Sequence, residues 1–446
     1  MLGILLVTWV ALLVGLIAFA IGRPREGGAL TLSYFLGLSL IHVPGALAFL
    51  AGASFTSSYG LSNSMATEAG FKMTVIGLAA FVAGAILARG IDRRRIQSNR
   101  SSSLRRSEAF QRIGRRGLAI GAFAYFILMP LSHSVSSLTA VISPSAILLI
   151  IGLWLVLYGA AESGDRRRIR VVLILLPLLP LATLVTGGFL GYGIYWVLSV
   201  IAFLFIISQH RARIYAAAPF VIYLGLSVFV VYMGQRTEIR ELVWEKQAGI
   251  AERLERVSRI ITDFHLLDPT SPADLAVLDD RLNQNSFVGL AIGHIETGWA
   301  HFVYGGTVPL WGLVPRAIWP EKPEVGGGGT IVADFTGIQF WGYTSVGAGQ
   351  VLEFYVNFGV PGVVTGFLLL GFTLVWLDRG IMRALARNDL RGLLLRAMPG
   401  LTLLQPGGNL LEILVAVFAA IVVAHLLIHV RALHIFWGTT GAGQTA

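Results

Sequence analysis

Long apolar runs separated by short polar connectors form the dominant pattern along this chain. An apolar run of about 20 residues is long enough to cross a bilayer as a helix. The pattern predicts eleven such helices, at residues 2–21, 29–51, 71–91, 117–131, 145–162, 171–187, 190–208, 215–233, 351–376, 393–405 and 409–430. The run at 393–405 is short and contains Pro399, so a re-entrant half-helix stays open there. The chain is therefore expected to be an all-α polytopic membrane protein.

One polar segment is much longer than the other connectors. It covers residues 234–350 and separates eight predicted transmembrane helices in 1–233 from the last helices and a tail in 351–446. Within this segment, apolar residues recur at helical spacing from Thr237 to Ile261, which predicts an amphipathic helix. The pair Ser271-Pro272 is typical of the N-cap and first position of a second, short helix.

The composition agrees with a membrane protein. Hydrophobic residues make up 55% of the 446 residues, charged residues make up 13%, and the mean hydropathy is +0.73. The chain has no cysteine, which excludes disulfides and thiolate metal sites. The N-terminus is apolar from its start, with no basic residues before the run. We therefore expect a first membrane helix there and not a cleaved signal peptide.

The basic residues predict the orientation in the membrane. Nine arginines lie in the connector 92–117, four in 164–170, two in 210–213 and five in 378–396. With eleven helices these four connectors fall on one side, which the positive-inside rule assigns to the cytoplasm. The N-terminus and the segment 234–350 are then extracytoplasmic, and the C-terminus is cytoplasmic.

The net charge has the same explanation. The segment 234–350 contains nine Lys and Arg against fourteen Asp and Glu, so its net charge is −5. Since the whole chain has a charge of +10, the rest of the chain has +15. The basic character therefore reflects membrane orientation and contact with anionic lipid, and no nucleic-acid partner is expected.

The clearest candidate chemistry lies in a proline-rich stretch of the large segment. Pro315, Pro320 and Pro323 favour a rigid, extended backbone, and four glycines at 326–329 follow as a hinge. A fixed backbone would present the Arg316 guanidinium for bidentate contact with phosphate oxygens. The alternative is a structural arginine that pairs with a nearby glutamate or reaches lipid headgroups. Lys322 could give a point charge to a leaving diphosphate, or lie at the interface.

Arg236 and Arg240 form a second candidate anion site. They lie one helical turn apart, directly after the run 215–233 and at the predicted outer surface. Two arginines so placed suit an anionic headgroup or a diphosphate. Arg281, beside Asp279 and Asp280, is expected to form a local salt bridge instead.

The candidates for acid–base chemistry are His294, Glu296, His301, Asp334 and Glu353. Glu353 begins an apolar run, and ionisable groups in membrane spans usually face a cavity or a partner. A catalytic base and a structural Glu353–arginine pair both stay open. Asp334 either acts from a flexible loop or caps a turn. No metal-ligand spacing is present, so no metal site is expected. Most aromatic residues of the segment are expected to form an interfacial belt, and some to stack on sugar rings.

Two stretches together carry a family resemblance. The sequence VPRAIWPEKP, followed about thirty residues later by GQVLEFYVNFGVPG, resembles the Wzy-like oligosaccharide repeat-unit polymerases of O-antigen and exopolysaccharide synthesis. The matching residues are Pro315, Arg316, Trp319, Pro320, Lys322, Pro323, Glu353, Tyr355, Asn357, Phe358 and Gly359. Family members often have an arginine in a glycine-rich turn between two mid-chain helices. The corresponding turn here, Thr186 to Gly193, has the glycines but no arginine, so its role is in doubt or has passed to Arg236 or Arg240.

The resemblance implies a GT-C-like membrane glycosyltransferase without a cofactor. It would polymerise undecaprenyl-diphosphate-linked oligosaccharides on the outer face of the bacterial cytoplasmic membrane, using one as donor and one as acceptor. A flippase and a chain-length regulator of the same pathway are the implied partners. The implied catalytic residues are Arg316, Glu353, Asp334 and His294; the diphosphate ligands are Arg236, Arg240, Arg316 and Lys322; the glycan contacts are Trp319, Tyr355 and Asn357.

Two other functions stay open. A glycan ligase of similar architecture, such as an O-antigen ligase, would use the same donor with a different acceptor. A transporter of lipid-linked glycans would require paired intramembrane charges or inverted repeats, and the sequence has few of the first and no clear instance of the second.

Overall fold

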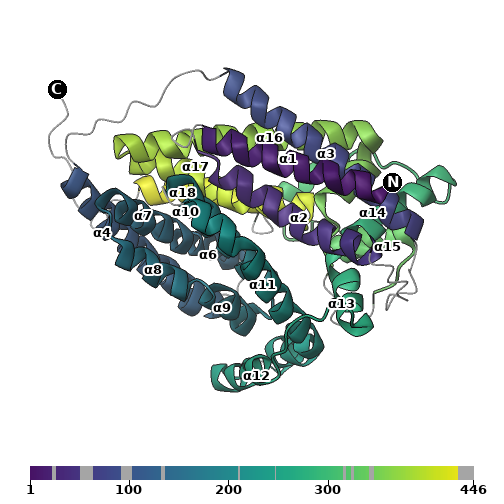
Figure 1. Ribbon diagram of the computed structural model, residues 1–446, viewed down its shortest axis with the longest axis horizontal. Coiled ribbons are helices and arrows are strands. Elements are labelled where there is room, and N and C mark those ends of the chain that lie inside the picture. Colours follow the sequence, from purple (N-terminus) through teal and green to yellow (C-terminus); the bar gives the residue numbers. More distant parts are fainter. Residues whose placement is uncertain are drawn as a thin grey trace.

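A computed structural model describes residues 1–22, 27–50, 64–91, 103–131, 136–208, 211–246, 248–314, 318–322, 326–340 and 346–429. These residues form helices and connecting segments, with no strand among them. The helices, shown in Figure 1, are α1 (Leu2–Gly22), α2 (Ala29–Leu50), α3 (Ser64–Ile91), α4 (Ser103–Phe123), α5 (Met129–Leu131), α6 (Ser136–Ala146), α7 (Leu148–Ser163), α8 (Arg166–Leu175), α9 (Leu178–Gly187), α10 (Leu190–Ile207), α11 (Arg211–Arg240), α12 (Ile250–Thr262), α13 (Pro272–Leu282), α14 (Gln284–Glu296), α15 (Gly328–Thr336), α16 (Gln350–Arg387), α17 (Leu390–Thr402) and α18 (Leu410–His429). Short π-helical turns follow α4 (Ala124–Leu128) and α11 (Glu241–Glu245), and Leu310–Leu313 is a 3₁₀ turn.

Nine helical stretches of the described chain are long and apolar enough to cross a membrane. They are Leu2–Gly22, Ala29–Leu50, Met65–Ile91, Val141–Ser163, Arg166–Gly187, Leu190–Ile207, Arg211–Glu245, Gln350–Arg387 and Leu410–His429. Because buried backbone groups in lipid must be paired within the segment, such helices are the expected form of a spanning chain. This is the architecture of a polytopic membrane protein.

Two of the eleven predicted spans are not among these nine. The run 117–131 is helical, but it is the end of the arginine-rich α4 followed by a π turn and α5. The run 393–405 belongs to α17, whose 13 residues span about 20 Å, less than the hydrocarbon thickness. Both runs are nevertheless helical for most of their length and pack against neighbouring helices of the described chain.

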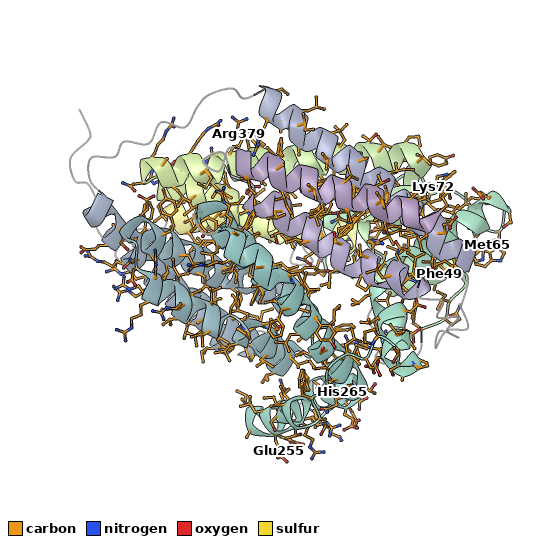
Figure 2. All side chains as sticks on the ribbon, in the orientation of Figure 1. Phe49, Met65, Lys72, Glu255, His265 and Arg379 are labelled. Atoms are coloured by element: carbon orange, nitrogen blue, oxygen red, sulfur yellow. The ribbon has the colours of Figure 1, made fainter. Side chains whose placement is uncertain are left out.

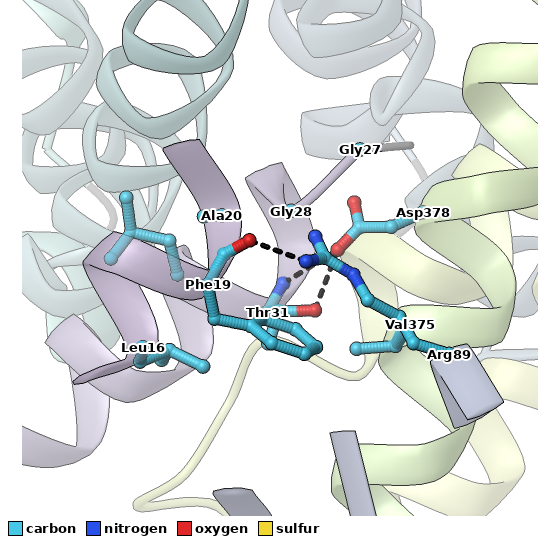
Figure 3. A pocket seen from close by; sticks show the side chains of 10 residues that line it. Leu16, Phe19, Ala20, Gly27, Gly28, Thr31, Arg89, Val375 and Asp378 are labelled. Carbon is cyan, nitrogen blue, oxygen red and sulfur yellow. Dashed lines mark hydrogen bonds between the residues drawn. The ribbon is translucent and has the colours of Figure 1, made fainter. Parts of the chain in front are cut away.

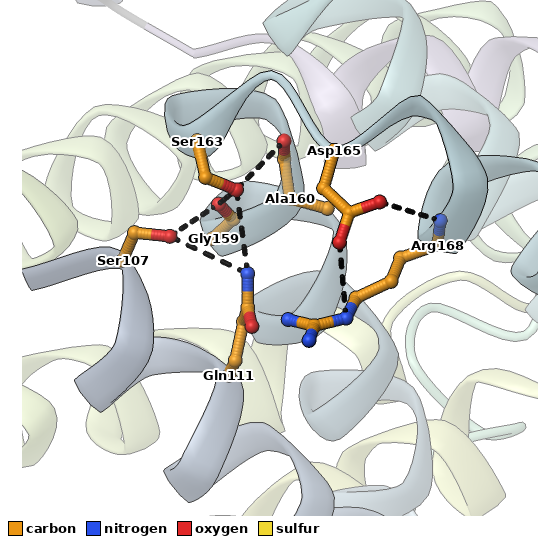
Figure 4. A network of polar contacts seen from close by, with 7 residues as sticks. All are labelled: Ser107, Gln111, Gly159, Ala160, Ser163, Asp165 and Arg168. Carbon is orange, nitrogen blue, oxygen red and sulfur yellow. Dashed lines mark hydrogen bonds and ion pairs between the residues drawn. The ribbon is translucent and has the colours of Figure 1, made fainter. Parts of the chain in front are cut away.

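Tight packing of α4 on α7 places two basic regions at the same end of the molecule. The helices are antiparallel: Gly121 lies against Leu149, and Gly159 lies against Gln111. The Ser107 hydroxyl donates to the Gly159 carbonyl at 2.7 Å, and the Asp165 side chain caps α8 and pairs with Arg168 at 3.1 Å (Figure 4). The start of α4 and the start of α8, both rich in arginine, therefore lie together.

The same end contains a buried carboxylate. Asp378 of α16 accepts hydrogen bonds from the backbone N–H groups of Leu30 at 2.9 Å and Thr31 at 3.0 Å, and from the Thr31 hydroxyl at 2.7 Å. It thus caps the N-terminus of α2. Figure 3 shows this contact beside Arg89, whose guanidinium donates to the Phe19 carbonyl and lies 3.5 Å from the Phe19 ring centroid.

The large segment between α11 and α16 is built onto the opposite end of the bundle. Asn285 of α14 lies against Gly70 of α3, and Asn283 lies against Gly45 of α2. In Figure 1 helices α12 to α15 gather at this end, and in Figure 2 Glu255 and His265 lie far from Arg379. Residues 234–350 therefore extend the helical core in place of forming an independent loop.

Two local predictions in this segment have different outcomes. The single helix expected from Thr237 to Ile261 is wrong: α11 ends at Arg240, a π turn follows, and α12 begins after the extended Gly249. The second helix is confirmed. Pro272 is the first residue of α13, and the Ser271 hydroxyl accepts from the Asp274 N–H at 3.3 Å.

Candidate functional site

The candidate site is organised by a break in α16. Phe358 and Gly359 have non-helical backbone angles, with φ of +63° at Gly359, and Pro361 follows. Proline has no N–H, so it cannot bond the carbonyl of Asn357 four residues earlier. The first eight residues, Gln350 to Asn357, therefore form a short separate helical piece that carries Glu353, Tyr355 and Asn357.

The chain after α14 occupies the carbonyls that the break leaves open. The N–H of Val303 donates to the Val356 carbonyl at 3.0 Å, and the N–H of Tyr304 donates to the Asn357 carbonyl at 3.1 Å. The Asn357 side chain completes this contact: its Oδ1 accepts from the Gly305 N–H, and its Nδ2 donates to Thr307 Oγ1, both at 2.7 Å. Asn357 is buried and positions the segment 303–307.

Glu353 is fully buried, with 0% of its surface exposed. Its Oε2 accepts from the Leu410 N–H at 2.5 Å, so the carboxyl group caps the N-terminus of α18. The Thr307 hydroxyl also faces the carboxyl group, but Oε1 has no hydrogen-bond partner in the described chain. No basic side chain of the described residues forms an ion pair with Glu353, and of its two readings this arrangement favours the buried base.

A close backbone approach surrounds this carboxyl group. Gly347 packs so tightly against the Gly407 carbonyl that a Cβ would clash there. The Ala348 N–H donates to Asn409 Oδ1 at 3.0 Å, and the Gln350 N–H donates to the Pro406 carbonyl at 3.0 Å. The Tyr34 hydroxyl of α2 donates to Gln350 Oε1. The start of α16 is thus enclosed by polar groups from α2 and the α17–α18 connection.

Arg240 of α11 lies beside the glycine-rich turn at 186–193. Arg240 is buried, with its guanidinium carbon 4.9 Å from the Phe189 ring centroid and 4.8 Å from that of Trp244. Its side chain also lies against Gly188. Arg236, one turn earlier, is buried as well, and the charge of Arg281 acts on Arg240. Sequence reasoning had assigned Arg281 only a local salt bridge.

The proline-rich stretch is described in part. Arg316 lies outside the described residues. Lys322 Nζ donates to the carbonyls of Gly312 at 2.9 Å and Val314 at 2.8 Å, so it holds the two sides of this stretch together. Trp319 is 42% exposed, and its carbonyl accepts from the Lys322 N–H at 3.3 Å. Tyr355, another predicted glycan contact, is buried.

His294 and Asp334 come close through α15. His294 Nδ1 lies 2.9 Å from the carbonyl of Phe335, the residue after Asp334, which requires the Nδ1–H tautomer. The His294 ring also lies 4.3 Å from that of Trp299. Asp334 is exposed on α15. Among the described residues, the Glu353 hydrogen bonds do not reach His294, Asp334, Arg236 or Arg240, so the predicted residues fall into separate groups.

A buried polar network escaped sequence reasoning. His42 of α2 lies 2.7 Å from Asn285 Oδ1 through its Nδ1, and Asn285 Nδ2 donates to Asn283 Oδ1 at 3.0 Å. Asn283 Nδ2 then donates to Asp279 Oδ1 at 2.7 Å. Burial raises the pKa of the Asp279 carboxyl group, the Asn283 bond lowers it, and the charge of Asp280 raises it. The sequence feature that could have indicated this network is His42, a histidine within the apolar run 29–51.

Within the described residues, no three His, Asp or Glu side chains are placed to hold a metal ion. Comparison with known proteins adds no relative, because no family model, no curated protein and no solved structure matches this chain.

Proposed function

We propose that this chain is a GT-C-like glycosyltransferase of the bacterial cytoplasmic membrane that polymerises lipid-diphosphate-linked oligosaccharide repeat units on the outer face. The donor's undecaprenyl diphosphate is the leaving group, so the site must stabilise charge that develops on the diphosphate. Preorganised cations are the usual means of doing so.

The observation that carries this proposal is the position of Arg240. It comes from the end of a candidate membrane span, and its guanidinium lies over two adjacent aromatic rings at the glycine turn, where the charge of Arg281 also acts on it. Arginine presents planar donors on a permanent positive charge, which suits bidentate contact with phosphate oxygens. A diphosphate has the charge and the oxygen atoms for such a site.

Glu353 is the proposed general base for the acceptor hydroxyl. Its Oε1 has room for one more hydrogen bond, while Oε2 stays fixed by the Leu410 N–H. Because Glu353 is fully buried, a sugar hydroxyl reaches Oε1 only if the chain around the carboxyl group opens. His294 and Asp334 are the alternative base candidates.

The test is the product that the purified full chain in proteoliposomes makes from an undecaprenyl-diphosphate-linked repeat unit. A ladder of polymers supports the proposal. A single transfer that requires a lipid A core acceptor would identify a ligase instead. Movement of the glycan across the membrane without any transfer would identify a transporter.

Arginine variants sharpen the same assay. Arg240→Lys keeps the charge but loses the planar fork and the ring contacts, so we expect polymer formation to fall at least about tenfold. Arg316→Lys is expected to impair it for the same reason. Arg259→Ala, on the exposed face of α12, is the matched control. Arg253 is unsuitable as a control because it donates to the carbonyls of Ala248 and Val185.

The orientation is a separate proposal. Cysteine at Ser163, at the arginine-rich end, should react only with a reagent supplied from the cytoplasm. Cysteine at Thr270 should react only from outside, and the absence of native cysteine makes the background low. Reaction of both from one side would contradict the arrangement and the outer-face site.

A further inference from the structure

Tyr304 has a backbone conformation that tyrosine rarely adopts. Its φ is +46°, one of two positive values among the non-glycine residues that the structure describes. The left-handed region costs an ordinary residue about 1 kcal/mol or more, so it persists only where the surroundings impose it. Here the surroundings are the bonds from the Tyr304 and Gly305 N–H groups to Asn357.

The imposed turn brings two exposed aromatic rings together. The Tyr304 side chain is 74% exposed and that of Phe358 is 53% exposed. Their ring centroids are 6.3 Å apart with an interplanar angle of 64°, so the two rings form a corner. We name this pair the aromatic corner. Phe302 supports it from within, since its ring lies 6.3 Å from Tyr304 and against Gly359.

Both rings of the aromatic corner depend on unusual backbone. Phe358 lies at the break of α16, with φ of −141° and ψ of 15°, and Tyr304 lies in the left-handed turn that docks on the same break. An ordinary helix would have directed neither ring to this place. Two adjacent departures from regular geometry that both present an exposed ring indicate a binding surface.

A membrane-interface belt is the competing explanation for exposed aromatic residues. Belts consist mainly of Trp and Tyr on ordinary helices, where the polar tip reaches water. The aromatic corner differs because Phe358 has no polar tip and because a buried asparagine fixes the turn. Phe358 also directly follows the short helical piece, Gln350 to Asn357, that carries Glu353.

We infer that the aromatic corner binds a pyranose ring of a neutral oligosaccharide, with the C–H face of the sugar stacked on Tyr304 and its edge against Phe358. This assignment rests on the proposed function for its biological role, since it gives the glycan of the lipid-linked substrate a place beside the candidate base. It also replaces the buried Tyr355 as the aromatic sugar contact.

The test measures sugar binding without any transfer reaction. The purified full chain in detergent is titrated with cellotetraose, chitotetraose and mannotetraose, and saturation-transfer NMR reports contact with sugar C–H groups. Tyr304→Phe keeps the ring and should bind within about twofold of the wild type. Tyr304→Asn removes the ring but tolerates the left-handed turn, so its affinity should fall about five- to tenfold with an unchanged melting temperature.

Trp376→Leu is the matched control, since Trp376 is another exposed aromatic residue of α16, beyond the break. It should leave sugar binding unchanged. Equal binding by Tyr304→Asn and the wild type would overturn the inference, and so would a wild-type chain that contacts none of the three tetrasaccharides. If Tyr304→Asn lowers the melting temperature in lipid but leaves sugar binding unchanged, the two rings belong to a membrane-interface belt. If the wild type binds the sugars at the aromatic corner but forms no polymer from the lipid-linked repeat unit, the inference about the aromatic corner holds and the proposed polymerase function fails.

Discussion

Two buried carboxyl groups lie at opposite ends of α16, and each caps the N-terminus of another helix. Asp378 receives three hydrogen bonds from two residues of α2, and both of its oxygens have partners. Glu353 receives one hydrogen bond from the first residue of α18, and its Oε1 has no partner in the described chain. The same helix therefore carries one fully paired and one partly paired carboxyl group.

The number of hydrogen bonds that each carboxyl group accepts indicates a structural role for Asp378 and a chemical role for Glu353. A buried carboxylate with several donors is stable as it is, and a further partner would have to displace one. A buried carboxylate with a free acceptor site retains the capacity to bind a proton or a hydroxyl group. Asp378 lies among the arginine-rich connectors, whereas Glu353 lies beside the large segment. The comparison therefore predicts that Asp378 stabilises the fold and Glu353 serves the reaction.

The largest effect on stability is expected from Asp378→Asn. The amide cannot accept from all three donors, and its own N–H₂ would face the N–H groups of α2. We expect a loss of about 3 kcal/mol in the free energy of unfolding, measured by denaturation in detergent micelles.

Asp389→Asn is the control for this change. Asp389 is an exposed cap of α17, with its Oδ1 accepting from Gly392 N–H at 2.8 Å, and asparagine caps a helix equally well. Its effect should be below about 0.5 kcal/mol. Equal losses of free energy of unfolding in Asp378→Asn and Asp389→Asn would mean that the burial of Asp378 does not increase its contribution to stability.

Glu353→Gln should affect the reaction and leave the fold intact. Glutamine still accepts from the Leu410 N–H, so the free energy of unfolding should change by less than about 1 kcal/mol. Polymer formation should fall about a hundredfold, because the general base is lost, while binding of the lipid-linked donor stays nearly unchanged. The initial rate of polymer formation and a donor-binding assay on the same preparation measure both.

Other results for Glu353→Gln have definite meanings. A variant that fails to accumulate, or that loses donor binding together with turnover, makes Glu353 an anchor, and Asp334 or His294 becomes the better candidate for the base. Normal polymer formation would show that no base at this position is needed. Either result would contradict the prediction that Glu353, unlike Asp378, serves the reaction.

The two carboxyl groups also show how far the sequence leads. Apolar runs located the nine candidate spans of the described chain, but the run 351–376 was predicted as one helix and gave no warning of the break at Phe358 and Gly359. The burial of Glu353 followed from its place at the start of an apolar run. Its partner did not, since Leu410 is 57 residues further along the chain and donates through its backbone. Every residue except proline has a backbone N–H, so the residue type does not reveal which one donates to Glu353.

The arginines also show that the sequence predicts neighbours on one helix but not relations between helices. The sequence singled out Arg236 and Arg240 as neighbours on one helix, which depends only on helical spacing. It did not indicate the effect of the Arg281 charge on Arg240, because the two residues belong to different helices, α13 and α11. The runs 117–131 and 393–405 have the composition of spans, but they are not among the nine candidate spans of the described chain, because α4 begins with an arginine-rich stretch and α17 has only 13 residues.

A smaller effect should distinguish the two threonines beside these carboxyl groups. Thr31→Val removes one charge-assisted hydrogen bond to Asp378, which should lower the free energy of unfolding by about 1.5 kcal/mol. Thr307→Val removes an acceptor for Asn357 Nδ2, which still donates to the Glu353 carbonyl at 2.7 Å. We expect about 0.5 kcal/mol there, with a clear loss of polymer formation. The reverse order in denaturation experiments would place the more important network at the Glu353 end.

The smallest effect is expected from Asp279, a third carboxyl group with an intermediate degree of pairing. It lies in α13, outside the candidate spans, where burial raises its pKa. A raised pKa means that the folded state binds the proton more tightly than the unfolded state. The resulting stability is fully present below the unfolded pKa and is lost as pH rises through the folded pKa. The melting temperature of the wild type relative to Asp279→Asn should therefore fall as pH rises above the usual aspartate range.

Asp268, just before α13, provides a control of opposite sign. Hydrogen bonds from the Thr270 hydroxyl and N–H lower the pKa of its exposed carboxyl group. Its contribution to stability is present above the unfolded pKa and is lost as pH falls. Relative to Asp268→Asn, the wild type should therefore gain melting temperature as pH rises. Slopes of the same sign for the two variants would mean that pairing, and not burial, governs Asp279, as it governs Asp378.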